Sequence, residues 1–271
     1  MTAPSAGEER EWLRTSLGRS SADSITVRGR DLAGELMGTM SFADVAFLLA
    51  AGREPSAGES KLFNAVLVSL ADHGLTPTAL AARLTYTGAP EALQGAVAAG
   101  LLGGGSVFLG PVEDTARFLA DILDGLPSEP GDDDLAAAAA DAARAAARTG
   151  RKVPGLGHPV HRETDPRVPR LYELARAAAL EGPHLRLLEL VATAHARETG
   201  RGLPINGAGA AGAALADMGF PPSLGRGFAL LARTAGLVGH LAEEADRPLG
   251  MRLWREVEDR ARAAGEDRLA T

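Results

Sequence analysis

Along most of the chain, apolar residues recur three or four positions apart, in segments that Gly or Pro residues bring to an end. This spacing places apolar side chains on one face of a helix, whereas a half-buried strand needs them at alternate positions. The first expected helix has Ser41 as its N-cap and stops at Gly52. The later ones are 61–73, 78–84, 91–101, 112–123, 135–148, 168–180, 185–198, 228–244 and 251–264. Because only Ser24–Arg28 has the β-branched character of a strand, we predict an all-α fold.

The composition bounds the core and the partners. Of the 271 residues, 45% are hydrophobic but only 4% are aromatic, so Ala, Leu and Val must fill the core between closely packed helices. The length is sufficient for one large domain or two modest ones. The formal net charge is −7 and no basic domain stands out, so we expect no nucleic-acid partner.

Cysteine is absent from the sequence, which excludes disulfides, thiolate metal sites and a cysteine nucleophile. No apolar run reaches the length of a membrane span, and the first residues, MTAPSAGEEREW, lack the pattern of a signal peptide. We therefore expect a cytoplasmic protein that has no membrane partner.

The segment Val153–Arg167, VPGLGHPVHRETDPR, is predicted to be a loop because its Pro and Gly residues block regular structure. Its titratable and charged side chains are His158, His161, Arg162, Glu163, Asp165 and Arg167. Imidazole can move a proton near neutral pH, and guanidinium groups suit the binding of anions. The segment is either a binding loop or a surface turn with solvated charges. A metal there would need a third ligand, so we expect no metal site.

Three glycines, Gly207, Gly209 and Gly212, form the pattern G-x-G-x-x-G within Leu203–Leu215. Such glycines indicate dinucleotide binding when a strand precedes them and an acidic residue follows about 20 positions later. Here Pro204 interrupts the strand, and no acidic residue stands at that distance. Close helix packing through small residues is therefore the favoured interpretation.

Two expected helices also carry residues that suit a site. His73 is placed at the end of the helix 61–73, where a histidine caps carbonyls and favours the helix dipole. Arg233, Gly236 and His240 share nearly one face of the helix 228–244.

Four segments of the chain resemble motifs of the citrate synthase superfamily, and within it the short proteins described as citryl-CoA lyases. They are ADHGLTP at Ala71–Pro77, VPGLGHPVHRETDPR at Val153–Arg167, ARTAGLVGHLAEE at Ala232–Glu244 and DRP at Asp246–Pro248. The resemblance extends from about Ser24 to Trp254, which is nearly the whole chain.

The resemblance implies a citrate synthase-like fold, in which a small helical domain, residues 107–201, is inserted into a large one, residues 1–106 and 202–271. It implies an active site in the cleft between these domains, and a homodimer. The expected partners are a CoA thioester and a dicarboxylate. Coenzyme A would be part of the substrate, with no tightly bound cofactor.

By position, the resemblance gives the catalytic role to His158, which would hold or protonate the oxygen of an oxaloacetate-like acid, or deprotonate the matching hydroxyl. The residues expected to bind the substrate are His73, Arg167, Arg233 and Arg247, the last from this subunit or the other. The residues expected to line the CoA site are Gly155, Leu156, Gly157 and Arg162. His73 thereby changes from a helix cap to a ligand contact.

Two positions depart from the synthase pattern. Gly103 stands where synthases carry a histidine, and Ala208 stands where they carry a catalytic aspartate; either loss should slow citrate synthesis by roughly 10²–10⁴-fold. The expected function is therefore the cleavage of citryl-CoA, or of a related 3-hydroxy-3-carboxyacyl-CoA. The alternative is a non-catalytic relative that binds a CoA ester or dicarboxylate. Glu163 and Asp165 are candidates for the missing acid, by proximity to His158.

Overall fold

The chain divides into two compact units, Met1–Asn64 and Ala65–Thr271, and the computed structural model describes residues 15–269 of it. The first residues, on which the expectation about a signal peptide depended, lie outside the described part. Among the described helices, none is long and apolar enough to cross a membrane. The large and small domains implied by the resemblance stay a prediction.

The first unit joins a small sheet to short helices. Its elements are β1 (Gly18–Ser20), β2 (Ile25–Val27), β3 (Arg30–Asp31), the π-helix η1 (Leu32–Leu36), α2 (Phe42–Ala51) and the start of α3 (Ala57–Ala71). The strands pair antiparallel in the order β1-β2-β3, with Thr26 opposite both Arg19 and Asp31. Only β2 was expected, because strands of two or three residues are too short to show a pattern. The predicted cap at Ser41 is confirmed, since its Oγ accepts the Asp44 N–H at 3.1 Å.

The second unit is helical. After the end of α3 come α4 (Pro77–Gly88), α5 (Leu93–Leu102), α6 (Gly110–Leu123), α7 (Asp132–Thr149), α8 (Arg167–Ala177), α9 (Pro183–Thr199), α10 (Gly207–Asp217), α11 (Pro222–Asp246) and α12 (Gly250–Leu269). The predicted all-α class is confirmed, and most helix ends fall within a few residues of their expected places. One prediction about the site is wrong: the helix expected to end at His73 ends at Ala71, so His73 lies in the segment after α3.

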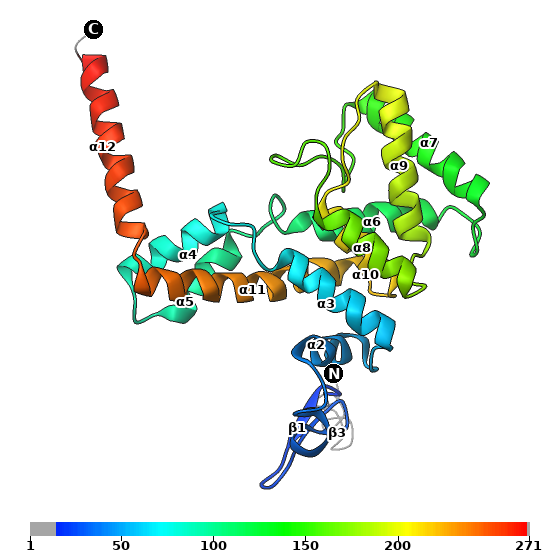
Figure 1. Ribbon diagram of the computed structural model, residues 1–271, viewed down its shortest axis with the longest axis horizontal. Helices are drawn as coiled ribbons and strands as arrows, with labels where there is room; N and C mark the ends of the chain where they lie inside the picture. Colours follow the sequence, from blue (N-terminus) through cyan, green and yellow to red (C-terminus); the bar gives the residue numbers. More distant parts are fainter. Residues whose placement is uncertain (1–14, 270–271) are drawn as a thin grey trace, which may run out of the picture. The chain divides into compact units, whose positions relative to one another are not determined.

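Helix α11 connects the other parts of this unit, as Figure 1 shows for the orange ribbon that runs beside α4 and α5. Near its start, a Cβ at Gly225 would lie 3.2 Å from Val112 of α6. Further along, a Cβ at Gly236 would lie 2.1 Å from the Ala71 carbonyl oxygen, so only glycine lets α11 pass the end of α3. Leu237 is fully buried against α4 and α5. Helix α11 thus brings Arg233 and His240 to the segment that carries His73.

The glycines of α10 serve packing, as predicted. A Cβ at Gly209 would lie 2.6 Å from the Gly155 Cα, and one at Gly212 would lie 2.3 Å from the Val112 carbonyl oxygen. Within the described residues no strand precedes Gly207, because Ile205 makes only an isolated bridge to Leu156. Both findings exclude the dinucleotide interpretation of the motif.

Candidate active site

Main-chain hydrogen bonds attach the predicted loop to the start of α10. The Gly157 N–H donates to the Pro204 carbonyl at 2.7 Å, and the Asn206 N–H donates to the Gly155 carbonyl at 2.9 Å. The Asn206 side-chain amide also donates to the Gly157 carbonyl at 2.9 Å. Gly155 and Gly157 adopt φ values of +85° and +79°, which L side chains rarely adopt. This loop is therefore a fixed scaffold for His158, and not a solvated surface turn.

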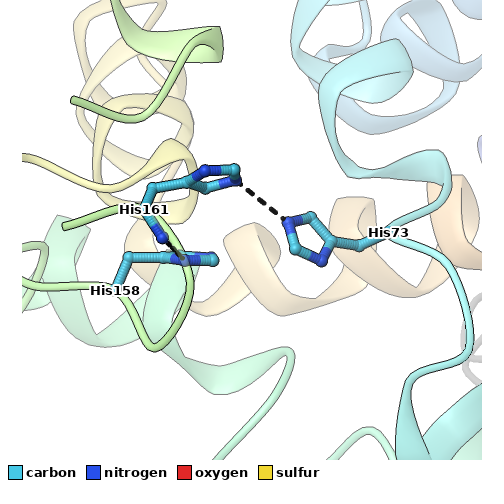
Figure 2. Close-up of side chains that lie close together, drawn as sticks. All are labelled: His73, His158 and His161. Carbon is cyan, nitrogen blue, oxygen red and sulfur yellow. Dashed lines mark hydrogen bonds between the residues drawn. The ribbon is translucent and has the colours of Figure 1, made fainter. Parts of the chain in front are cut away.

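Three imidazoles converge where this loop meets the segment after α3 (Figure 2). The His73 and His161 Nε2 atoms lie 3.4 Å apart. The rings of His158 and His161 stack, with centroids 4.4 Å apart and planes 27° apart. The centroids of His73 and His158 lie 5.3 Å apart. The sequence named His73 and His158 as site residues, and the structure adds His161 to them.

The tautomer of His158 follows from its main-chain contacts. Its Nδ1 accepts the N–H groups of Val160 at 3.1 Å and of His161 at 3.0 Å. A nitrogen that accepts hydrogen bonds carries no proton, so the neutral ring holds its proton on Nε2. Burial lowers the pKa of His158, and the nearby His161, His73 and Arg167 lower it further against the opposing effect of Asp165. His158 is therefore a neutral hydrogen-bond donor near neutral pH.

The same tautomer bears on metal binding. One ring nitrogen from each of His73, His158 and His161 lies within 4.8 Å of the others, a spacing that a metal ion could use. A histidine ligand, however, binds the metal through a lone pair while its other nitrogen donates a hydrogen bond. His158 does the reverse, because its Nδ1 lone pair faces two N–H donors. The cluster therefore suits a polar organic ligand better than a three-histidine metal site.

Arg167 reaches the cluster from the start of α8, held by Asp165. The Arg167 Nε and Nη2 donate to the two Asp165 oxygens at 2.9 and 2.7 Å, and its Nη1 donates to the Ser69 carbonyl at 3.1 Å. Asp165 also accepts the Gly207 N–H at 2.8 Å. Burial alone would raise the pKa of Asp165, but these donors outweigh it and hold the pKa well below its usual range. Asp165 is thus a fixed anion that orients Arg167.

Arg233 brings a second guanidinium to the site from α11. It is only 7% exposed, and within the described part of the chain its Nε and Nη1 have no hydrogen-bond partner. The nearest carboxylate oxygen, of Asp72, lies 3.8 Å from Nη1. Burial lowers the pKa of Arg233, Asp72 opposes this, and Arg167 lowers it further, so the two arginines interact. Buried donors without partners are costly, and an anionic ligand would satisfy them.

Beside Arg233 lies a buried network that sequence reasoning missed. Arg83 of α4 donates to Glu244 at 2.9 Å and to the His240 Nδ1 at 3.0 Å, and it also contacts Glu243. Since a guanidinium only donates, the His240 proton lies on Nε2, which donates to Asp72 at 2.9 Å. A single arginine in a helix normally indicates a solvent-exposed position. No local pattern shows that the partners of Arg83 lie on α11.

The remaining predicted residues lie apart from the cluster. Arg162 and Glu163 are exposed, and Arg247 has a side chain 76% exposed that pairs with Glu243 and Asp246. Arg247 follows the end of α11, about 20 Å along the helix axis from Arg233 at about 1.5 Å per residue. Within one chain it therefore does not join the other arginines.

At Gly103, where the resemblance expects a histidine, an added Cβ would meet no heavy atom closer than 3.5 Å. Ala208 is half-buried in the first turn of α10. Gly103 caps α5 at a φ of −70° and is exposed. The backbone at Gly103 and at Ala208 is one that larger residues also adopt. Backbone strain therefore does not explain why the expected histidine and aspartate are absent.

A cavity of about 1070 Å³ lies between α7, α8 and α9, with Asp165 in its lining. Its lining includes Glu163, Tyr172 and Arg176, but none of the three histidines. The cavity and the histidine cluster are therefore separate features.

Residues 39–256 match the family model described as citrate synthase, C-terminal domain. The chain belongs to the citrate synthase family. A comparison with curated proteins found no match. The match to the family model confirms the predicted superfamily.

Solved structures place the chain more finely. Citryl-CoA lyase from Hydrogenobacter thermophilus is 35% identical, with a TM-score of 0.75 over 85% of this chain and 86% of that one. ATP citrate lyase from Methanothrix soehngenii, solved with citrate and coenzyme A, is 20% identical with a TM-score of 0.72 over 91% of this chain and 40% of that one. Citrate synthase from Thermoplasma acidophilum, solved with carboxymethyl coenzyme A and oxaloacetate, is 20% identical with a TM-score of 0.62 over 76% and 54%. The last two show the fold alone.

Proposed function

We propose that this protein is a citryl-CoA lyase, which cleaves citryl-CoA, or a related 3-hydroxy-3-carboxyacyl-CoA, to acetyl-CoA and oxaloacetate. The observation that carries the proposal is the buried Arg233, whose Nε and Nη1 lack partners in the described part of the chain and which interacts with Asp72 and Arg167. A carboxylate, such as each of those in citryl-CoA and oxaloacetate, satisfies such donors. The 35% identity to the Hydrogenobacter thermophilus citryl-CoA lyase, over 86% of that chain, supports the choice of reaction.

The arginines hold the acid half of the substrate. Arg233 binds one carboxylate through its buried donors, and Arg167, already oriented by Asp165, offers a second positive charge. Arg247 completes the clamp from the partner subunit of a homodimer, because in its own chain it lies far along α11. His73 contacts the same acid from the segment after α3.

His158 acts on the oxygen that changes charge. Its Nε2–H donates to the hydroxyl of citryl-CoA and then to the ketone oxygen of oxaloacetate, and it stabilises the negative charge that develops in between. The two main-chain donors on its Nδ1 favour this role over that of a base, which the sequence also allowed. A neutral donor positioned in advance loses little energy in reorganisation during the reaction.

The thioester half of the substrate lies along the loop Val153–Arg167. Gly155, Leu156 and Gly157 line the CoA site where the loop meets α10, and Arg162 is exposed beside them for a CoA phosphate. Cleavage and synthesis share the enolate of acetyl-CoA, so the choice of cleavage rests on the 35% identity to the Hydrogenobacter thermophilus citryl-CoA lyase.

The experiment supplies purified protein with citryl-CoA and measures acetyl-CoA and oxaloacetate, beside the variants His158→Asn and Arg144→Met. Arg144 lies exposed on α7, so its variant controls for handling and fold. We expect turnover by the wild type and by Arg144→Met, and a loss of about 10²–10³-fold in His158→Asn, as for removal of an oxyanion donor.

Ala208 and Gly103 support the alternative, a non-catalytic binder of a CoA ester or dicarboxylate. That alternative predicts that oxaloacetate and CoA raise the melting temperature while citryl-CoA persists unchanged. Turnover that depends on His158 would remove it, and stabilisation without turnover would replace the lyase proposal.

A further inference from the structure

Cleavage of citryl-CoA leaves two proton transfers to explain. A base must take the proton of the tertiary hydroxyl, and an acid must give a proton to the carbon of the enolate that leaves. Ala208 has no carboxylate and Gly103 has no imidazole for these tasks. His158 is a donor to the same oxygen and has no lone pair turned toward the substrate.

The nearby carboxylates do not fit either task. Asp165 is fully buried and bound to Arg167 and the Gly207 N–H, and these donors keep its pKa far below the range of a useful base. Asp72 accepts hydrogen bonds from His240 and from the Gly74 N–H. Glu163 is exposed and lines the separate cavity. The tasks therefore fall to the remaining imidazoles.

Of these, His161 has the better geometry. Its ring stacks on His158 at 4.4 Å with planes 27° apart, so the edges of the two rings face in one direction, as Figure 2 shows. An oxygen that accepts from the His158 Nε2 then lies within reach of the His161 Nε2. His73 is tilted by 54° at 5.3 Å from His158, and it faces the pair from the opposite side.

We infer that His161 is the acid–base catalyst of this site, an inference that rests on the proposed function. The His161 Nε2 takes the hydroxyl proton of citryl-CoA, and the bond between the carbinol carbon and the CH₂ of the thioester breaks. The electron pair of that bond forms the acetyl-CoA enolate, while the carbinol carbon becomes the ketone of oxaloacetate. The imidazolium then returns its proton to the CH₂ carbon, which gives acetyl-CoA and restores neutral His161.

A single group can perform both transfers because the reaction neither releases nor takes up a proton overall. The His73 Nε2, 3.4 Å away, is a hydrogen-bond partner for the His161 Nε2 in the resting site. This scheme explains how the family fold can cleave citryl-CoA with alanine at position 208.

His161→Gln is a clean test, because the hydrogen bond by which His161 fixes the His158 tautomer comes from its main-chain N–H and not from its ring. The substitution therefore leaves the His158 tautomer intact. Glu163→Gln, two residues further along the same loop, is the matched control. The measurements are kcat and KM for citryl-CoA, and deuterium uptake into the acetyl-CoA methyl group in D₂O with malate, which cannot condense, in place of oxaloacetate.

We expect His161→Gln to lower kcat by about 10²–10⁴-fold with KM changed less than about threefold, and to abolish deuterium uptake, while Glu163→Gln retains both. In His161→Gly, added imidazole should restore part of kcat, which a loss of structure would not allow. Cleavage and exchange at the wild-type rate in His161→Gln would overturn the inference and leave the lyase function standing. Absence of both reactions in the wild type would overturn the proposed function together with it.

Discussion

Two buried arginines, Arg83 and Arg233, show how the same side chain can serve structure or binding. Arg83 is 2% exposed and its guanidinium is surrounded by Glu244, Glu243 and the His240 Nδ1. Arg233 is 7% exposed, yet its nearest carboxylate lies 3.8 Å away and makes no hydrogen bond with it.

The difference in hydrogen-bond partners assigns a structural role to Arg83 and a binding role to Arg233. The fold itself satisfies the charge of Arg83, so this residue holds α4 to α11. The charge of Arg233 is left for something the chain does not supply, which is the property of a binding residue. Burial alone does not distinguish the two; the hydrogen-bond partners do.

Removal of Arg83 should have the largest effect. Arg83→Met leaves Glu244 buried, with only the Leu249 and Gly250 N–H groups as donors, and should destabilise the fold by about 3–5 kcal/mol. Urea unfolding measures this loss. Arg117→Met, which removes a surface pair with Glu113, should cost no more than about 0.5 kcal/mol. Equal losses in the two variants would show that the Arg83 network is not structural.

Arg233→Met should give the opposite pattern. No carboxylate depends on Arg233 for a hydrogen bond, so the free energy of unfolding should change by less than about 1 kcal/mol. Binding of oxaloacetate, measured by calorimetry, should weaken by about 10- to 100-fold, because charge-assisted hydrogen bonds are lost. A large loss of stability with unchanged binding would reverse the roles assigned to the two arginines.

Low pH should reduce the stability that the pair of Arg83 and Glu244 contributes. Burial would raise the pKa of Glu244, but the Gly250 N–H, Arg83 and the Leu249 N–H outweigh it and lower the pKa. A lowered pKa in the folded state means that this stability is present above the unfolded pKa and is lost as the pH falls through the folded one.

The melting temperature of the wild type should therefore fall more steeply below about pH 4.5 than that of Glu244→Gln, by about 2–4 °C for each kcal/mol lost. Parallel melting curves from pH 6 to pH 3 would show that Glu244 does not contribute to this dependence.

The smallest effect on stability should come from Arg247→Ala, at about 0–0.5 kcal/mol, because the side chain is 76% exposed. The lyase activity of Arg247→Ala should nevertheless fall if Arg247 completes the active site of the partner subunit. Mixing Arg247→Ala with His158→Asn should then recover activity, since a hybrid dimer contains one site with both residues. If mixing recovers nothing, Arg247 does not act across a dimer.

The sequence could predict what depends on local pattern. The helices, the Ser41 cap and the loop at Val153–Arg167 follow from spacing and from Gly and Pro positions. The shared face of Arg233 and His240 also follows from helix geometry, and both residues do meet Asp72. The family motifs named His73 and His158 before any geometry was known.

Other features depend on contacts that no local pattern encodes. The end of α3 at Ala71 follows from a turn in which Asp72 accepts the Gly74 N–H and Gly74 adopts a φ of +76°. The partners of Arg83 come from α11, far along the chain. His161 stood in the sequence beside more conspicuous residues, and only its stacking on His158 distinguishes it.

The contact between Gly155 and Gly209 has a consequence for engineering. Main-chain N–H groups hold the His158 ring, so the side chains at positions 160 and 163 can be varied in a library for other acyl groups without moving it. Positions 155 and 209 must stay glycine in such a library, because a single methyl group at 209 would meet the Gly155 backbone at 2.6 Å.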